Sequence, residues 1–213
     1  MRKFHIGLAT VTGAALLSYA AVQAADEPAA APDPSRVSGG TYTVDSGHSL
    51  VGWKVNHIGI NDYFGLFGDV KGTLKLDPAN ISASEVEVTI PVSKVLTASP
   101  RLTEELVHEA GKDGAPAPFF GPDPADAVFK STQVRPAGGN QALITGMLTL
   151  NGVTKPVSIM AELSGAGING YSKKENIGFH GWGEINRSDF GVNGALPGTS
   201  DKVRLDITIA FTK

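Results

Sequence analysis

Residues 144–163 read ITGMLTLNGVTKPVSIMAEL, and this stretch carries the strongest structural signal in the chain. Apolar or small residues occupy every second position from Ile144 to Leu150 and again from Val157 to Leu163. Such alternation gives a β-strand one buried and one solvated face. Asn151-Gly152 stands between the two runs and is a strong signal for a two-residue turn. The stretch therefore predicts an antiparallel β-hairpin.

Five further runs alternate in the same way, and they cover residues 49–57, 70–76, 86–90, 177–183 and 203–209. Together with the hairpin they predict seven or eight antiparallel strands.

One helix is expected from Arg101 to Ala110, because Ser99 can cap it and Pro100 suits its first position. Residues 111–126 contain four prolines and are expected to form a loop. With no second helix layer, the strands must form a barrel or a sandwich.

Four glycines fall on the apolar faces of these runs: Gly72, Gly146, Gly181 and Gly183. Glycines on an inward face help strands to bend and leave space inside. They favour an all-β antiparallel barrel with an apolar pocket over a sandwich with a filled core.

The first residues have the pattern of an export signal. Arg2 and Lys3 precede an apolar stretch, and Val22-Gln23-Ala24 offers the small residues that a signal peptidase needs. A transmembrane anchor is the alternative, but the apolar stretch is short and interrupted by polar residues. We expect a cleaved signal peptide over residues 1–24 and a periplasmic protein.

Residues 25–40 are rich in Ala and Pro and predict a disordered linker, which leaves one domain over residues 41–213. Removing residues 1–24 takes away Arg2 and Lys3 and no acid, so the formal net charge changes from −3 to −5. That charge argues against a nucleic-acid partner and against electrostatic docking on anionic lipid. The chain has no cysteine, which excludes thiol chemistry and a lipoprotein anchor. We expect no stable membrane insertion, and the sequence is compatible with a monomer or a homodimer.

Candidate ligand-binding residues lie on the apolar faces of the predicted strands. The simplest interpretation is that these side chains fill the core, as inward-facing apolar residues do by default in a β-protein. A barrel of about eight strands is the size at which the interior can hold one ligand. The candidates are Val51, Trp53, Val55, His57, Leu74, Val88, Ile90, Leu148, Ile159, Phe179, Leu205 and Ile207.

The histidines do not form a recognisable metal motif. His48 and His57 are nine residues apart, His108 lies on the predicted helix, and His180 lies on a late strand. A metal site needs three or four converging ligands, and no His-x-His pair is present. No Gly-x-Ser-x-Gly nucleophile elbow occurs. We expect no metal, no cofactor and no catalytic residue.

The densest polar cluster is NRSDFG, residues 186–191. Arg187 and Asp189 could tie a barrel rim as an ion pair, which suits a turn beside a glycine. Arg187 could instead grip an anionic head group. The sequence favours the structural role.

Four stretches resemble the YceI-like family, also called the polyisoprenoid-binding or lipid-binding YceI-like domain. They are residues 42–57, 67–74, 146–157 and 186–192, and they span nearly the whole predicted domain. The resemblance implies an eight-stranded, lipocalin-like antiparallel barrel with a helix, closed around an elongated apolar pocket. It also implies a polyisoprenoid or similar long-chain lipid as ligand and no catalytic residues.

One segment departs from the family pattern. The family usually has a short helix with a His-Leu-Arg-type sequence, soon followed by Asp-Phe-Phe. Here residues 101–108 read RLTEELVH, and a Gly/Pro-rich segment precedes Phe119-Phe120. We expect this lengthened loop near the mouth of the barrel.

Three functions are compatible with the sequence. The favoured one is a non-enzymatic periplasmic protein that sequesters or carries a long-chain isoprenoid or related lipid. The second is an enzyme, a hydrolase or isomerase that uses His57 or His180 within the cavity. The third is a structural or stress-response protein with a filled barrel.

Overall fold

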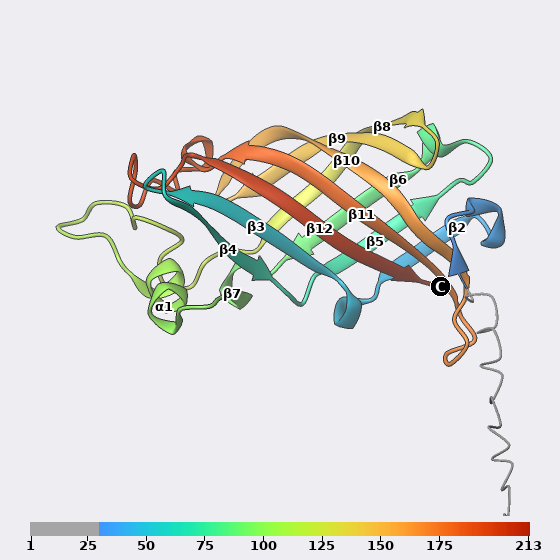
Figure 1. Ribbon diagram of the computed structural model, residues 1–213, viewed down its shortest axis with the longest axis horizontal. Helices are drawn as coiled ribbons and strands as arrows, with labels where there is room; N and C mark the ends of the chain where they lie inside the picture. Colours follow the sequence, from blue (N-terminus) through green and yellow to red (C-terminus); the bar gives the residue numbers. More distant parts are fainter. Residues whose placement is uncertain (1–29) are drawn as a thin grey trace, which may run out of the picture.

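A computed structural model describes residues 30–213, so the expected signal peptide and residues 25–29 lie outside the described part. Strands dominate this part of the chain, with one α-helix at one end (Figure 1). The strands are β1 (Ala30–Ala31), β2 (Gly40–Val44), β3 (Leu50–His57), β4 (Asn61–Phe67), β5 (Lys71–Leu76), β6 (Glu85–Ile90), β7 (Val95–Thr97), β8 (Ala127–Gly138), β9 (Gln141–Leu150), β10 (Val153–Ile168), β11 (Glu175–Asn186) and β12 (Lys202–Thr212).

The sheet closes on itself. Antiparallel pairing runs from β2 through β5, β6, β8, β9, β10, β11 and β12, and β12 pairs with β2 to complete the ring. Closure pairs each strand of the ring with a neighbour on both sides, which is the reason a barrel is stable without a covering layer. The predicted eight-stranded antiparallel barrel is therefore confirmed.

Three members of the ring continue beyond an interruption. A 3-10 helix over Ser46–His48 separates β2 from β3, and a second one over Val92–Lys94 separates β6 from β7. The continuations β3, β4 and β7 pair with one another in the order β12, β3, β4, β7. β3 extends the barrel wall along β12 as far as Lys54, and β4 and β7 continue the sheet from β3 toward the helix.

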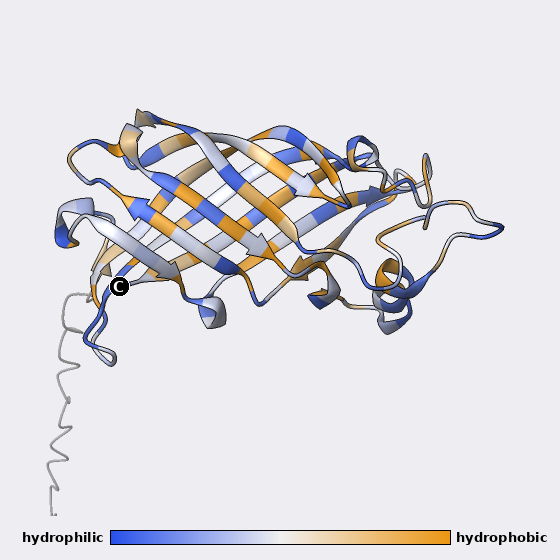
Figure 2. Cartoon of the chain, turned by 180° about the vertical axis from the view of Figure 1, so that it is seen from behind, coloured by the Kyte–Doolittle hydropathy of each residue, from blue (hydrophilic) through white to orange (hydrophobic). Residues whose placement is uncertain are grey.

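The hairpin predicted from residues 144–163 is present. β9 and β10 pair antiparallel from Leu150–Val153 to Gln141–Glu162. Asn151 and Gly152 both have positive φ, at 51° and 76°, as the predicted two-residue turn requires. Hydropathy alternates along the strands as bands of opposite colour (Figure 2), which places one face of each strand inside the barrel.

Helix α1 (Pro100–His108) covers one end of the barrel (Figure 1). Ser99 caps it as expected, because its hydroxyl accepts a hydrogen bond from the backbone N–H of Leu102 at 3.3 Å. Leu106 and Val107 are buried against Val95, and Trp53, Phe67, Leu102, Phe119 and Phe120 pack around them. We call these eight residues the cap cluster. The lengthened loop between α1 and β8 contributes Phe119 and Phe120 to it.

The chain before β2 differs from the expected disordered linker over the described residues 30–40. β1 pairs with the end of β10, Pro34–Arg36 form a 3-10 helix, and Val37 is buried. A proline-rich segment is ordered here because β10 extends past β9 and offers it a free edge. We call residues 30–37 the N-terminal strap.

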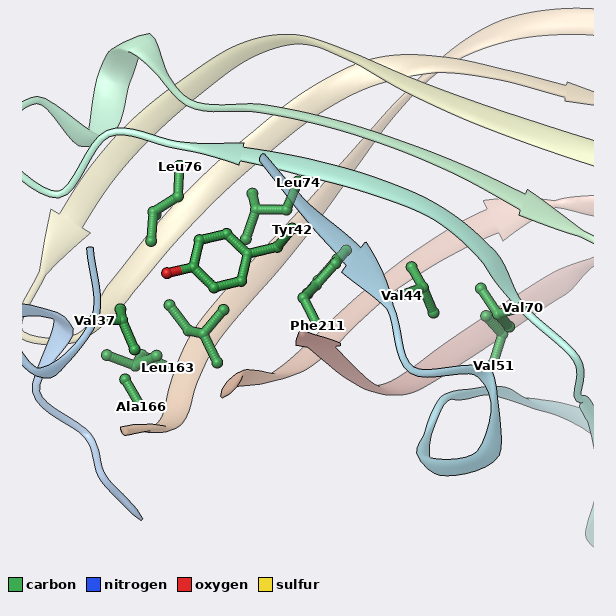
Figure 3. Packing of buried hydrophobic residues seen from close by; sticks show 11 residues of the cluster. Val37, Tyr42, Val44, Val51, Val70, Leu74, Leu76, Leu163, Ala166 and Phe211 are labelled. Atoms are coloured by element: carbon green, nitrogen blue, oxygen red, sulfur yellow. The ribbon is translucent and has the colours of Figure 1, made fainter. Parts of the chain in front are cut away.

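The strap joins a cluster of apolar side chains at the end of the barrel opposite α1. Tyr42 is fully buried among Leu74, Leu76 and Leu163, while its hydroxyl faces the strap (Figure 3). Tyr42 Oη lies 2.7 Å from Glu175 Oε2 and 2.6 Å from the carbonyl oxygen of Ser38. These contacts tie the first strand of the ring to the start of β11.

Candidate functional site

The barrel encloses a cavity of about 310 Å³. Its wall comes from seven strands of the ring, β5, β6, β8, β9, β10, β11 and β12, and from Val51 of β3, because these strands turn apolar side chains inward. All but four of the lining residues are apolar or glycine. The filled-barrel hypothesis is therefore not what the structure describes.

Nine of the twelve candidate residues line this cavity. They come from β3, β5, β6, β9, β10, β11 and β12, so strands distant in sequence meet around one space. These nine are Val51, Leu74, Val88, Ile90, Leu148, Ile159, Phe179, Leu205 and Ile207.

The other three candidates, Trp53, Val55 and His57, do not line the cavity. Trp53 lies in the cap cluster, where its ring packs over Gly65. β3 pairs with β12 only as far as Lys54, so Val55 and His57 lie beyond the closed ring. Alternation identifies the inward face of a strand but not the point at which the barrel ends, and this is why the prediction included them.

Several lining residues were missed because β-bulges shift the phase of alternation. β8 has a register shift between Ser131 and Gln133, so Phe129 and Val134 both face inward although their spacing is odd. β10 has a similar shift after Leu163. The apolar alternation of β8 is visible in the sequence once one inserted residue is allowed between Phe129 and Val134.

Phe129 has room because of a glycine on the neighbouring strand. A Cβ atom added to Gly146 would lie 2.5 Å from Cζ of the Phe129 ring. The inward-facing Gly146 was expected to leave space in the barrel. That space is occupied by the Phe129 ring.

The four polar lining residues all lie at the end of the barrel away from α1. We call them the polar rim: Ser84, Glu85, Asn140 and Gln141. Pro34 of the strap and Gly139 of the β8–β9 turn line the cavity beside them. Apart from Val70, between β4 and β5, the lining residues outside the strands lie at this end, so we take it as the mouth.

The lengthened loop, which was expected near the mouth, lies at the α1 end, opposite the end that we take as the mouth. Phe120 of this loop packs edge-on against Phe67 with ring centroids 6.2 Å apart, inside the cap cluster. The backbone N–H of Phe120 also donates to the carbonyl of Leu106 at 3.0 Å. The departure from the family pattern therefore seals the far end of the barrel rather than shaping its mouth.

None of the histidines in the described residues lines the cavity. His180 Nε2 lies 2.7 Å from Asp206 Oδ1 on the outer face of the barrel, and His57 is exposed beyond its end. No group of three or more His, Asp or Glu side chains converges as a metal site within residues 30–213. The enzyme hypothesis relied on a cavity histidine, and His57 and His180 are not in that position.

Arg187 has a structural role, as the sequence favoured, but not through the expected ion pair with Asp189. The guanidinium donates to the carbonyl oxygens of Ser200, Val192, Gly194 and Thr199 at 2.7–3.1 Å. Burial lowers the pKa of Arg187. The N–H groups of the Arg187 guanidinium point at loop carbonyls, and Arg187 does not line the cavity. It therefore does not bind a head group there.

Asp201, and not Asp189, is the carboxylate that holds this turn, and it does so through Ser188. Its carboxylate accepts hydrogen bonds from the backbone N–H and the hydroxyl of Ser188 at 2.8 and 2.7 Å. The backbone hydrogen bond is the main reason why the pKa of Asp201 is lowered.

Within the described part of the chain, no helix has the length and apolar character needed to cross a bilayer.

A closed antiparallel barrel with an apolar interior and a helix across one end is the architecture of lipocalin-like barrels. Residues 42–211 match the family model described as YceI-like domain. The UPF0312 protein of Pseudomonas fluorescens strain SBW25 is 33% identical over 207 residues, which cover 96% of this chain and 95% of that protein. A UPF0312 protein of Shewanella oneidensis is 34% identical over 178 residues, 83% of this chain and 89% of that protein. The chain belongs to the YceI-like family, which confirms the resemblance.

Solved structures share the fold. BcnA of Burkholderia cenocepacia superposes with a TM-score of 0.64 at 23% identity and covers 78% of this chain and 98% of that one. The YCEI protein of Campylobacter jejuni gives 0.58 at 27% identity over 74% and 89%. A polyisoprenoid binding domain from Saccharophagus degradans gives 0.55 at 13% identity over 80% and 97%.

Proposed function

We propose that this protein is a non-catalytic periplasmic binding protein that holds a polyisoprenoid or a similar long-chain lipid inside its barrel. The observation that carries the proposal is the cavity itself, which is lined by inward apolar side chains from β3 and from seven strands of the ring. The similarity to a structure named as a polyisoprenoid binding domain supports the choice of ligand class.

The energetics favour a long hydrocarbon over a compact ligand. Each CH₂ group removed from water contributes about 0.8 kcal/mol, so a chain lying along the barrel axis gains affinity with length. Directional polar contacts are not needed for this gain. A wall with few polar side chains suits such a ligand better than a sugar, a nucleotide or a peptide.

The periplasmic location is supported by the signal-peptide pattern of residues 2–24. The test is fractionation of cells that express the full chain, followed by N-terminal sequencing of the mature protein. We expect it in the periplasmic fraction with Ala25 as its first residue. Recovery in the cytoplasm with residues 1–24 intact would contradict this part of the proposal.

The ligand class is tested on protein purified from its native compartment. Organic extraction and mass spectrometry should find a long-chain lipid at a substantial fraction of the protein concentration. Delipidated protein should then bind an isoprenoid alcohol on titration. If no lipid is extracted and no isoprenoid binds, the binding function is wrong.

A further inference from the structure

Among residues 30–213, the polar rim holds all of the polar side chains that line the cavity, and each of them already has a partner. Ser84 Oγ accepts from the N–H of Asp77 at 3.0 Å, and Glu85 forms an ion pair with Lys75 at 3.5 Å. At the β8–β9 turn, Asn140 Nδ2 donates to the carbonyl oxygen of Pro32, and Gln141 Nε2 donates to Glu162 Oε2, both at 2.8 Å. The rim therefore holds the strap and the neighbouring strands together.

Among the described residues, none that lines the cavity is a lysine, an arginine or a histidine. Glu85 is the one charged residue among those that line the cavity, and its side chain is directed to Lys75. Arg187, which is a buried cation, lies outside the lining and is engaged by four carbonyls. A phosphate or carboxylate placed inside would be desolvated without a counter-charge, which is strongly unfavourable.

The end at α1 offers no exit for a polar group either. Phe67 and Phe120 of the cap cluster also pack against the buried residues Val92, Phe129 and Phe190 at that end of the lumen. A ligand with one polar end can satisfy that end with water only at the mouth.

We propose that the ligand lies with its hydrocarbon tail toward α1 and its head group in water at the polar rim. The protein then selects its ligand by the hydrocarbon chain and not by the head group. This inference rests on the proposed function and adds the orientation and the basis of selectivity. Two ligands that share one prenyl chain should bind alike, whether the head is neutral or anionic.

The first experiment compares geranylgeraniol with geranylgeranyl diphosphate. Both displace the apolar fluorophore N-phenyl-1-naphthylamine from delipidated protein, at concentrations below those at which either ligand forms micelles. We expect dissociation constants within about threefold of each other. A tenfold preference in either direction would overturn the inference, because it would mean that the head is gripped or is buried. Failure of both ligands to bind would instead count against the proposed function.

The second experiment places a charge at the expected head position. Asn140→Lys adds a cation to the mouth, so the diphosphate should bind at least threefold more tightly while the alcohol is unaffected by the charge. Asn140→Leu is the matched control, since it also loses the hydrogen bond to Pro32 but adds no charge. Asn193→Lys puts the same cation on an exposed residue at the α1 end and should change neither affinity.

Tighter binding of the diphosphate to Asn193→Lys, with no change for Asn140→Lys, would show the reverse orientation. No response to either lysine would show that the head approaches neither end. Both results contradict the proposal.

Discussion

At the scale of single residues, Arg187 determines the conformation of the loops at the α1 end. Its guanidinium joins the turn after β11 to the segment before β12 through four carbonyl oxygens. That segment in turn contacts the β3–β4 hairpin, where the N–H of Ile58 donates to the carbonyl of Gly198 at 2.6 Å. The side chain is only 6% exposed, so water does not replace it easily.

Arg187→Met should lower the free energy of unfolding by about 2–4 kcal/mol, because buried carbonyl acceptors lose their donors. Chemical denaturation followed by circular dichroism measures the loss. Arg204→Met is the control, since Arg204 is exposed and paired with Glu184, and it should cost less than about 1 kcal/mol. Equal losses for the two variants would contradict the role assigned to Arg187.

Glu175 makes the stability of the mouth end depend on pH. Hydrogen bonds from Tyr42 and then from Ser38 lower the pKa of Glu175 from its usual value of 4.5. A carboxyl whose folded pKa is depressed stabilises the fold above its unfolded pKa, and this contribution is lost as the pH falls through the folded pKa. The stabilisation is thus complete at neutral pH and decreases below about pH 4.5.

Tyr42→Phe removes the first of these hydrogen bonds and should make the fall in unfolding free energy between pH 5 and pH 3 shallower than in the wild type. Urea denaturation at a series of pH values gives this slope. Tyr63→Phe, in β4, is the matched control and should leave the slope unchanged. A slope that is the same in Tyr42→Phe and wild type would show that Tyr42 does not hold the carboxylate.

The same tyrosine also limits stability at high pH. Burial, with the hydrogen bond to Glu175, raises the pKa of Tyr42 to about 12. The folded state therefore keeps the phenol proton that the unfolded chain releases above about pH 10. Wild-type stability should decline above that pH, and Tyr42→Phe should remove this part of the decline.

At the scale of elements, the sequence predicted the strands that alternate without interruption, together with the Asn151-Gly152 turn and the single helix. It missed β8, because the bulge near Ser131 breaks the alternation, and β1, because two alanines carry no pattern. It also named no run for β2, β4 and β7. It also extended the predicted inward-facing set along β3 to Trp53, Val55 and His57, which do not line the cavity. The end of the barrel is set by pairing with β12, which the sequence of β3 alone does not contain.

The cap cluster depends on a close approach between β3 and β4. A Cβ atom at Gly65 would lie 2.1 Å from Cζ2 of Trp53, so the indole ring occupies the position of a side chain. Trp53 is thereby held against α1 and not in the cavity. Gly65 was not among the glycines identified from the sequence, because the partner that requires it lies on another strand.

Gly65→Ala should therefore destabilise the protein by about 1–3 kcal/mol through overpacking. Trp53 fluorescence should also shift, since its ring must move. Gly68→Ala is the control, because no heavy atom lies within 4 Å of the added Cβ there. A stable Gly65→Ala variant with unchanged fluorescence would show that the cap cluster tolerates the methyl group.

At the scale of the whole molecule, the two ends of the barrel have different constructions. The α1 end is closed by aromatic and aliphatic side chains from three separate segments. The opposite end is closed by the strap, which pairs with β10 through only two residues and touches the β8–β9 turn through the Asn140 hydrogen bond. Opening the strap would break this pairing and this hydrogen bond and expose Val37, whereas opening the other end would expose the whole cap cluster, which agrees with a mouth at the strap.

Val88→Glu tests the cavity as the binding site. Val88 lines the middle of the β6 wall, and a carboxylate there would face apolar side chains without a partner. The affinity for geranylgeraniol should fall at least tenfold. Thr89→Glu is the matched control, because residue 89 is adjacent in sequence but does not line the cavity, and its affinity should stay within twofold of the wild type.

Because Val88→Glu also costs folding energy, its circular dichroism spectrum and thermal transition must be compared with those of Val88→Ala. Val88→Ala lacks the charge and removes wall atoms, so it should remain folded and weaken binding only moderately. If Val88→Glu is folded and binds the alcohol as tightly as the wild type, the lipid does not occupy the barrel, and another surface of the molecule must bind it.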